Sequence, residues 1–113
     1  MNSLDAADLG SVLARIRRLV ASGDIRITQH AQTEMAEEEL LLDEVKFALG
    51  SGQILENYPQ HRRGPCCLVC GFTQSGRPLH VVCTTGGDVL ILITVYEPKP
   101  PKWVTPFRRE MKP

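Results

Sequence analysis

Residues 78–103 read PLHVVCTTGGDVLILITVYEPKPPKW, and this stretch decides the fold. Two apolar runs, Pro78–Thr84 and Val89–Tyr96, flank the turn-forming residues 86–88 (Gly-Gly-Asp) and predict a β-hairpin. The second run, VLILITV, has no polar alternation, which is typical of a central strand covered on both faces. We therefore expect a sheet with this strand inside it.

The sequence before residue 78 predicts further strands of the sheet, and the sequence after Glu97 predicts its end. Cys66–Phe72 predicts a strand joined to Pro78 by the turn residues 74–77, and Gln53–Tyr58 predicts another. A brief strand is expected at Ile25–Ile27. After Glu97, four prolines precede Phe107, so we expect neither a regular helix nor a regular strand there.

Helices are expected in the first half of the chain. Apolar residues at helical spacing predict one over residues 4–21, with Ser3 as a cap and a solvated face carrying Arg15, Arg17 and Arg18. A phosphate-binding stripe is the alternative interpretation of those arginines. Two more helices are expected at Gln29–Glu39, capped by Thr28, and at Leu42–Leu49.

Helices first and hairpin-linked strands afterwards predict an α+β fold, in which N-terminal helices pack on a mostly antiparallel sheet of three to five strands. The 113 residues fit a single domain, 1–113. Lysine plus arginine and aspartate plus glutamate number 13 each, so no net charge draws the chain to nucleic acid or to an anionic membrane. Without a membrane-length apolar run or a signal-peptide layout, we expect a cytoplasmic protein.

Four cysteines lie within a short stretch: Cys66, Cys67, Cys70 and Cys83. In a cytosolic chain they are expected to be reduced thiols. Residues three apart in a strand point to opposite faces, so the CxxC spacing of Cys67 and Cys70 favours core packing. Chelation of zinc by Cys66, Cys70, Cys83 and His80 is the minor alternative, and we otherwise expect no metal ion and no cofactor. His80, in mid-strand, is expected to be a hydrogen-bonded, semi-buried histidine.

Several segments resemble one family. They are His30-Ala31 with Met35, Val45-x-x-Ala48-Leu49-x-x-Gly52, Gly64-Pro65, Gly71-Phe72, GRPLHVV at residues 76–82, and ITVYEP at residues 93–98 with Trp103 and Phe107-Arg108 downstream. Together they resemble the domain of unknown function 4258 family over about residues 25–110. The resemblance divides the domain into a helix (1–24), a core (25–97) and a proline-rich tail (98–113).

This resemblance implies a fold like that of the RelE/ParE and BrnT toxins, whose best-known members cleave messenger RNA and are held by an antitoxin. The implied activity is metal-independent RNA cleavage, in which a base, a cation and an acid act on the phosphodiester. His30 at a helix start is expected to be the base, one of Arg62, Arg63 and Arg108 the cation, and Tyr96 the acid. Tyr58, His61 and Thr94 are further candidates for this site.

Two residues depart from the family pattern. Family members usually carry arginines where this chain has Glu34 and Glu38, and a ribonuclease needs cations beside the phosphate. The activity is therefore either lost or of another kind. The alternative function is a non-enzymatic interaction module that binds a small, antitoxin-like protein across its sheet or through the tail at Trp103–Arg109. A zinc-binding regulator is a third, weaker interpretation.

Overall fold

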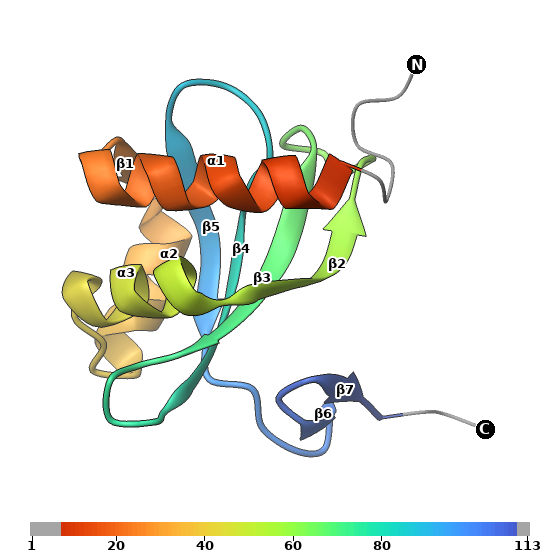
Figure 1. Ribbon diagram of the computed structural model, residues 1–113. Coiled ribbons are helices and arrows are strands. Elements are labelled where there is room, and N and C mark those ends of the chain that lie inside the picture. Colours follow the sequence, from red (N-terminus) through yellow and green to blue (C-terminus); the bar gives the residue numbers. More distant parts are fainter. Residues whose placement is uncertain (1–7, 111–113) are drawn as a thin grey trace.

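The computed structural model describes residues 8–110 and contains a five-stranded sheet in the order β1-β5-β4-β3-β2 (Figure 1). Strand β1 runs parallel to β5, and the other neighbours are antiparallel. The fold is therefore α+β with a mostly antiparallel sheet, as predicted. The strands are β1 (Ile25–Ile27), β2 (Gln53–Tyr58), β3 (Cys66–Phe72), β4 (Pro78–Thr84) and β5 (Leu90–Tyr96).

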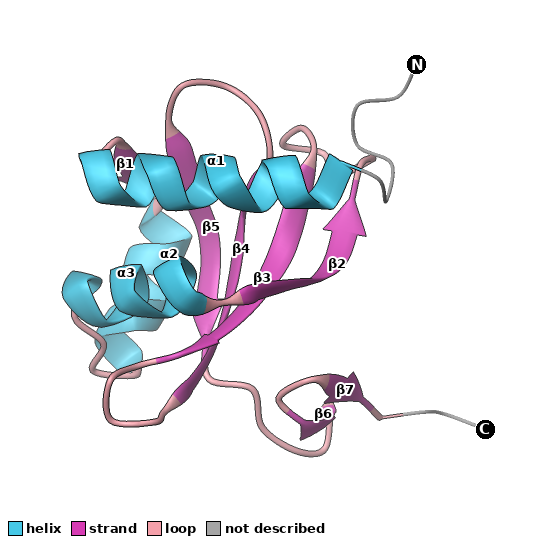
Figure 2. Cartoon of the chain, in the orientation of Figure 1, coloured by secondary structure: helices cyan, strands magenta, loops and turns pink. Residues whose placement is uncertain are grey.

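Three helices gather on one side of this sheet (Figure 2): α1 (Leu9–Ser22), α2 (Gln29–Glu37) and α3 (Leu42–Ser51). The first part of the predicted helix over residues 4–21, and its cap Ser3, lie outside the described residues. The hydroxyl of Thr28 accepts the N–H of Ala31 at 3.1 Å and caps α2, as predicted. Among residues 8–110, no helix is long and apolar enough to cross a membrane.

A bulge explains why β5 is apolar without alternation. Val82 pairs with Thr94 and Cys83 pairs with Leu92, so Ile93 is an extra residue in β5. Leu92 and Val95 can then both face the helices, although they are three residues apart, and both are fully buried. The prediction of an interior strand is confirmed, but full cover on both faces is wrong, because Thr94 and Tyr96 are only partly buried on the opposite face.

Helix α3 approaches β3 closely, and a glycine makes this contact possible. A β-carbon at Gly71 would lie 2.0 Å from the carbonyl oxygen of Ala48, so no larger residue fits without moving backbone. Because α3 packs closely on β3, it lies between α1 and the β3–β4 turn (Figure 1).

Arg15 is not part of a solvated basic face, and this expectation was wrong for it. Its side chain is 9% exposed and donates hydrogen bonds of 2.5–3.1 Å to four backbone carbonyls, those of Thr84, Gly86, Gly87 and Val89. The guanidinium supplies fixed donors to the β4–β5 turn, whose carbonyls converge on it. Arg17 and Arg18 are exposed, as predicted.

The proline-rich tail contains two short strands, which the sequence analysis had excluded. β6 (Trp103–Thr105) and β7 (Arg108–Arg109) form a small antiparallel hairpin. Prolines 98, 100 and 101 precede β6, and Pro106 lies in the turn, so the short run of β6 keeps its backbone N–H groups. The hairpin lies beyond the lower end of β5 in Figure 1, away from α1.

Candidate functional site

A groove of about 340 Å³ runs along the C-terminal end of β5, between α2 and the tail. Helix α2 contributes one wall, β5 the floor, and the residues before and within β6 the other wall. The groove carries hydroxyls, carboxylates and two ammonium groups around an aromatic residue. Its lining residues are Glu34, Thr94, Tyr96, Glu97, Lys99, Lys102 and Trp103.

Glu34 joins helix α2 to strand β5. One carboxylate oxygen accepts the backbone N–H of Val95 at 2.8 Å, and the other lies 3.2 Å from Nε2 of His30. Val95 lies on the edge of β5 beyond the reach of β1, which pairs only as far as Leu92. The carboxylate thus replaces a missing strand for this N–H group. His30, whose side chain is 63% exposed, faces solvent at the groove margin.

Tyr96 connects the groove to a buried histidine. His80 has no exposed surface, and its two ring nitrogens lie 3.0 Å from the Tyr96 hydroxyl and 2.6 Å from the carbonyl oxygen of Pro106. Because the carbonyl can only accept, Nε2 carries the proton and Nδ1 accepts from Tyr96. Burial lowers the pKa of His80 and raises the pKa of Tyr96, so both stay neutral at pH 7. The prediction of a hydrogen-bonded histidine is confirmed, but the ring is fully buried rather than semi-buried.

The hairpin is held over His80 by an aromatic ring and an ion pair. Trp103 is 2% exposed and contacts the His80 ring edge-on at 4.3 Å between centroids. The Arg109 guanidinium lies 4.7 Å above the indole and binds both oxygens of Glu56 at 2.7 and 2.8 Å. This pairing lowers the pKa of Glu56. The tail therefore lies across the open face of the sheet.

Tyr58 belongs to this same ion-pair cluster. Its hydroxyl donates to Glu56, and burial together with this bond raises the pKa of Tyr58 to about 12. A tyrosine with that pKa is a poor source of phenolate at neutral pH, so its role here is to hold the carboxylate.

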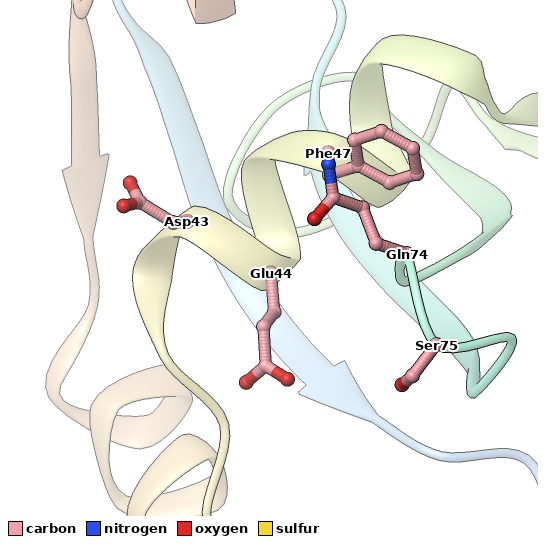
Figure 3. Close-up of a pocket in the computed structure, with 5 residues that line it drawn as sticks. All are labelled: Asp43, Glu44, Phe47, Gln74 and Ser75. Atoms are coloured by element: carbon pink, nitrogen blue, oxygen red, sulfur yellow. The ribbon is translucent and has the colours of Figure 1, made fainter.

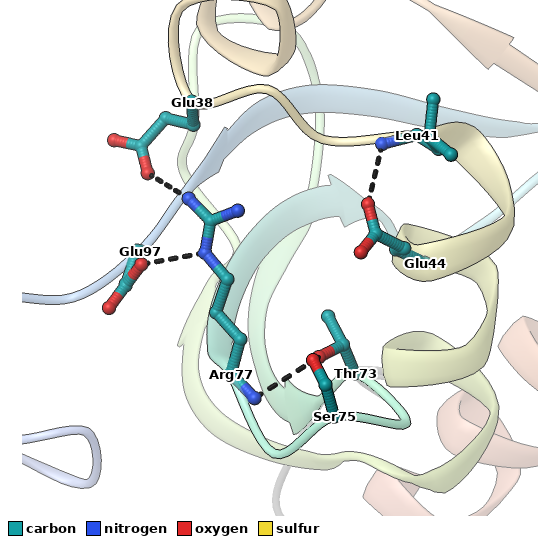
Figure 4. A network of polar contacts seen from close by, with 7 residues as sticks. All are labelled: Glu38, Leu41, Glu44, Thr73, Ser75, Arg77 and Glu97. Carbon is teal, nitrogen blue, oxygen red and sulfur yellow. Dashed lines mark hydrogen bonds and ion pairs between the residues drawn. The ribbon is translucent and has the colours of Figure 1, made fainter.

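The charges around the groove are unevenly compensated. Glu97 accepts from Nε of Arg77 at 2.7 Å, and the same guanidinium reaches Glu38 at 3.1 Å (Figure 4). Lys99 and Lys102 form no ion pair with any carboxylate in the described part of the chain. Two ammonium groups are thus free to meet an anion on one wall, while the carboxylates of the groove already have partners.

The predicted catalytic residues are only partly brought together. His30, Thr94 and Tyr96 lie in or beside the groove. His61, Arg62 and Arg63 lie in the β2–β3 loop, whose Pro65 contacts Thr85 at the far end of β4. Since Tyr96 pairs with His80, about four residues along β4 and roughly 13 Å separate that loop from the groove. Arg108 is exposed on β7, and its neighbour Arg109 makes the contacts.

The cysteines divide between the two faces of the sheet. Cys67 and Cys83 are register partners in the core under the helices, where their mutual hydrogen bond lowers the pKa of Cys67 and raises that of Cys83. Cys66, Cys70 and His80 lie on the opposite face, so the four proposed zinc ligands cannot meet at one ion. Burial also raises the pKa of Cys70 to about 11, which keeps it a thiol.

Some members of this site were missed by the sequence analysis. Lys99 and Lys102 were not selected because they lie in a tail that was expected to lack regular structure. The Glu56–Arg109 pair was not selected because its residues are 53 positions apart. A weak signal existed for the lysines, because both lie beside prolines near the tyrosine that was selected.

Comparison with known proteins gives one match. The model of a family described as a domain of unknown function (DUF4258) matches residues 27–97, which is more than half of the chain. No curated protein and no solved structure matches the chain. The matched segment includes α2, α3 and β2 to β5 with the last residue of β1, and it ends before the tail hairpin.

Proposed function

The chain belongs to this DUF4258 family, and we propose that it is a protein-interaction module that works by binding a small regulatory partner. The observation that carries the proposal is a set of exposed apolar side chains between the N-cap and the middle of α3. Leu41 is 70% exposed, Leu42 38% and Phe47 44%, although all lie within one short segment. Such concentrated exposure is costly in water unless a partner covers it.

The dispersal of the predicted catalytic residues supports the same proposal. An active site needs its base, acid and cation to converge on one reacting group. Here the Arg62-Arg63 pair lies far from Tyr96, and the imidazole of His80 is fully enclosed by the tail. His80 and Tyr96 instead stabilise the fold through their hydrogen bonds to each other and to the Pro106 carbonyl.

Site-specific photocrosslinking tests the interaction module. A photoreactive phenylalanine analogue replaces Leu41 or Phe47 in the full chain, expressed in its own cells, and Asp88 serves as a matched exposed control position. We expect a discrete adduct from positions 41 and 47 and none from position 88. Equal labelling at all three positions, or no adduct at 41 and 47, would contradict the proposal.

A second candidate is metal-independent RNA cleavage at the β5 groove, in a toxin-like protein. It is favoured by the His30–Glu34 pair beside Tyr96, with Lys99 and Lys102 on the opposite wall. The lysines would neutralise the phosphate in place of the distant arginines, and His30 would take the 2′-hydroxyl proton.

Cleavage of a mixed RNA substrate in EDTA tests this second candidate, with free RNA and with translating ribosomes. The wild-type chain is compared with His30→Ala and with the double variant Lys99→Ala, Lys102→Ala. Cleavage that is lost in both variants would support the activity. The absence of cleavage in both assays would leave the interaction module as the proposal.

A further inference from the structure

A hollow of about 440 Å³ lies between α3 and the β3–β4 turn. Its lining residues are Asp43, Glu44, Phe47, Gln74 and Ser75. Figure 3 shows Asp43, Glu44 and Phe47 extending from α3, with Gln74 and Ser75 on the β3–β4 turn. The hollow therefore combines an exposed aromatic ring with carboxylate and amide oxygens.

Both walls of this hollow are internally bonded. On the helix side, Glu44 uses one oxygen to accept the N–H of Leu41 at 2.8 Å, which leaves its other oxygen available (Figure 4). On the turn side, Thr73 accepts from the N–H of Arg77 at 3.1 Å and contacts Ser75 at 3.0 Å (Figure 4). A site with such supported walls is shaped before a ligand arrives.

The chain segment that leads to the hollow is acidic. Residues 34–44 contain six carboxylates and no lysine or arginine, and Lys46 is the first basic residue after them. Glu34 is bonded to Val95 and His30, and Glu38 is paired with Arg77. We call Glu37, Glu39 and Asp43 the acidic rim. These three residues form no ion pair with any residue between positions 8 and 110.

We infer that the hollow receives a lysine or arginine side chain from a basic, apolar segment of the partner protein. This inference rests on the proposed interaction module and names the chemistry of its partner. A cation over the face of Phe47 is attracted by the ring, and the free oxygen of Glu44 accepts its N–H groups. Leu41 and Leu42, which directly precede Asp43 in the chain, are exposed and available to apolar residues of the same segment.

Charge complementarity selects this occupant over others. Uncompensated carboxylates repel the phosphates of nucleic acid and of anionic lipid, so neither is expected to bind at the hollow. An acidic peptide would be repelled in the same way. Arginine is the better fit of the two basic residues, because its planar guanidinium both stacks on a ring and binds oxygens.

Selection from a random peptide library displayed on phage, with the immobilised full chain as bait, tests the inference. Peptides that also bind the Phe47→Ala variant are removed by counter-selection. The affinities of the remaining peptides for the wild-type chain and for the double variant Glu44→Gln, Asp43→Asn are then measured by fluorescence anisotropy. Glu44→Gln keeps the oxygen that caps Leu41, so the fold is retained. Asp88→Asn, which removes one carboxylate at the opposite end of the sheet, is the matched control.

We expect the selected peptides to be enriched in arginine or lysine beside bulky apolar residues. Their affinity should fall about tenfold or more in the double variant, weaken with added salt, and stay unchanged in Asp88→Asn. Selected peptides that are neutral or acidic would overturn the inference while leaving the interaction module in place. If Leu41 and Phe47 also give no crosslinked adduct, the module itself fails.

Discussion

The carboxylate of Glu34 accepts the backbone N–H of Val95 at 2.8 Å, across 61 positions of sequence. This position is one of the two at which the chain departs from the basic pattern expected by resemblance. Here the acidic residue completes the edge of β5, where β1 has already ended. Glu38 similarly pairs with Arg77, so both departures have structural roles in this chain.

Replacing Glu34 is expected to destabilise the protein, and the loss should be larger when the new side chain has no acceptor for the N–H of Val95. Glu34→Ala leaves the N–H of the fully buried Val95 without its partner and should lower the free energy of unfolding by about 1–3 kcal/mol. Glu34→Gln keeps an acceptor oxygen and should lose less. Urea denaturation measures both, and equal losses would show that the hydrogen bond to Val95 is not the cause.

Acidification is expected to loosen the tail through His80. Burial lowers the pKa of this imidazole below its ordinary value of 6.5, so the unfolded chain binds the proton first as the pH falls. The contribution of His80 to stability is therefore complete above pH 6.5 and is lost as the pH decreases below it. Fluorescence of Trp103, the only tryptophan, reports the release of the hairpin.

The variant His80→Gln isolates this effect, because glutamine does not titrate. We compare the pH dependence of unfolding in the two proteins, so that the contributions of all other groups cancel. If the free energy of unfolding changes with pH by the same amount in the wild type and in the variant between pH 4 and 7, His80 is excluded as the titrating group.

Two glycines near α3 are expected to respond in opposite ways to the same substitution. Gly71→Ala places a methyl group 2.0 Å from the carbonyl oxygen of Ala48 and should cost about 1–3 kcal/mol, because backbone must move. Gly50→Ala lies in α3 with open space around it and should stabilise by about 0.5–1 kcal/mol. Thermal unfolding of both variants checks the contact, and similar melting temperatures would contradict it.

Arg15 is expected to be needed for the β4–β5 turn. Arg15→Met keeps the apolar stem but removes the donors to four carbonyls, and should cost about 2–3 kcal/mol. Hydrogen exchange should accelerate in residues 84–90, near the turn. Arg18→Met, on the exposed face of the same helix, is the control and should have little effect.

Glu39 is expected to show opposite effects on stability and on binding. Its φ of 55° is left-handed, a conformation that favours glycine. Glu39→Gly should therefore raise the free energy of unfolding by about 0.5–1 kcal/mol, while weakening the binding of basic peptides. Glu37→Gln removes a charge without changing backbone strain, and should weaken binding alone. A Glu39→Gly protein with unchanged peptide affinity would exclude Glu39 from the acidic rim.

The parts of the fold that local sequence determines were predictable. Strands β2, β3 and β4 have the predicted bounds, because turn residues and apolar runs mark both ends of each. The cap residue Thr28 similarly placed the start of α2 at Gln29. The tail hairpin was not predictable, since strands of three and two residues are stabilised by distant contacts, above all that of Trp103 with His80.

The candidate site was less predictable than the fold for the same reason. Tyr96 and His30 were selected by residue type, and both lie at the groove. The role of Glu34 depends on the point at which β1 stops pairing with β5, and that of Arg15 depends on a turn about 70 positions away. Neither partner can be identified from spacing, because both are backbone groups without a sequence signal.

The enclosure of His80 means that the bounds of the family match and those of the cooperative folding unit differ in this protein. The family match ends at residue 97, whereas Trp103 and Pro106 complete the shell around the imidazole. At the other end, Ile16 of α1 is fully buried in the core and also lies outside the match. The cooperative unit therefore extends beyond the matched segment to include α1 and the tail hairpin.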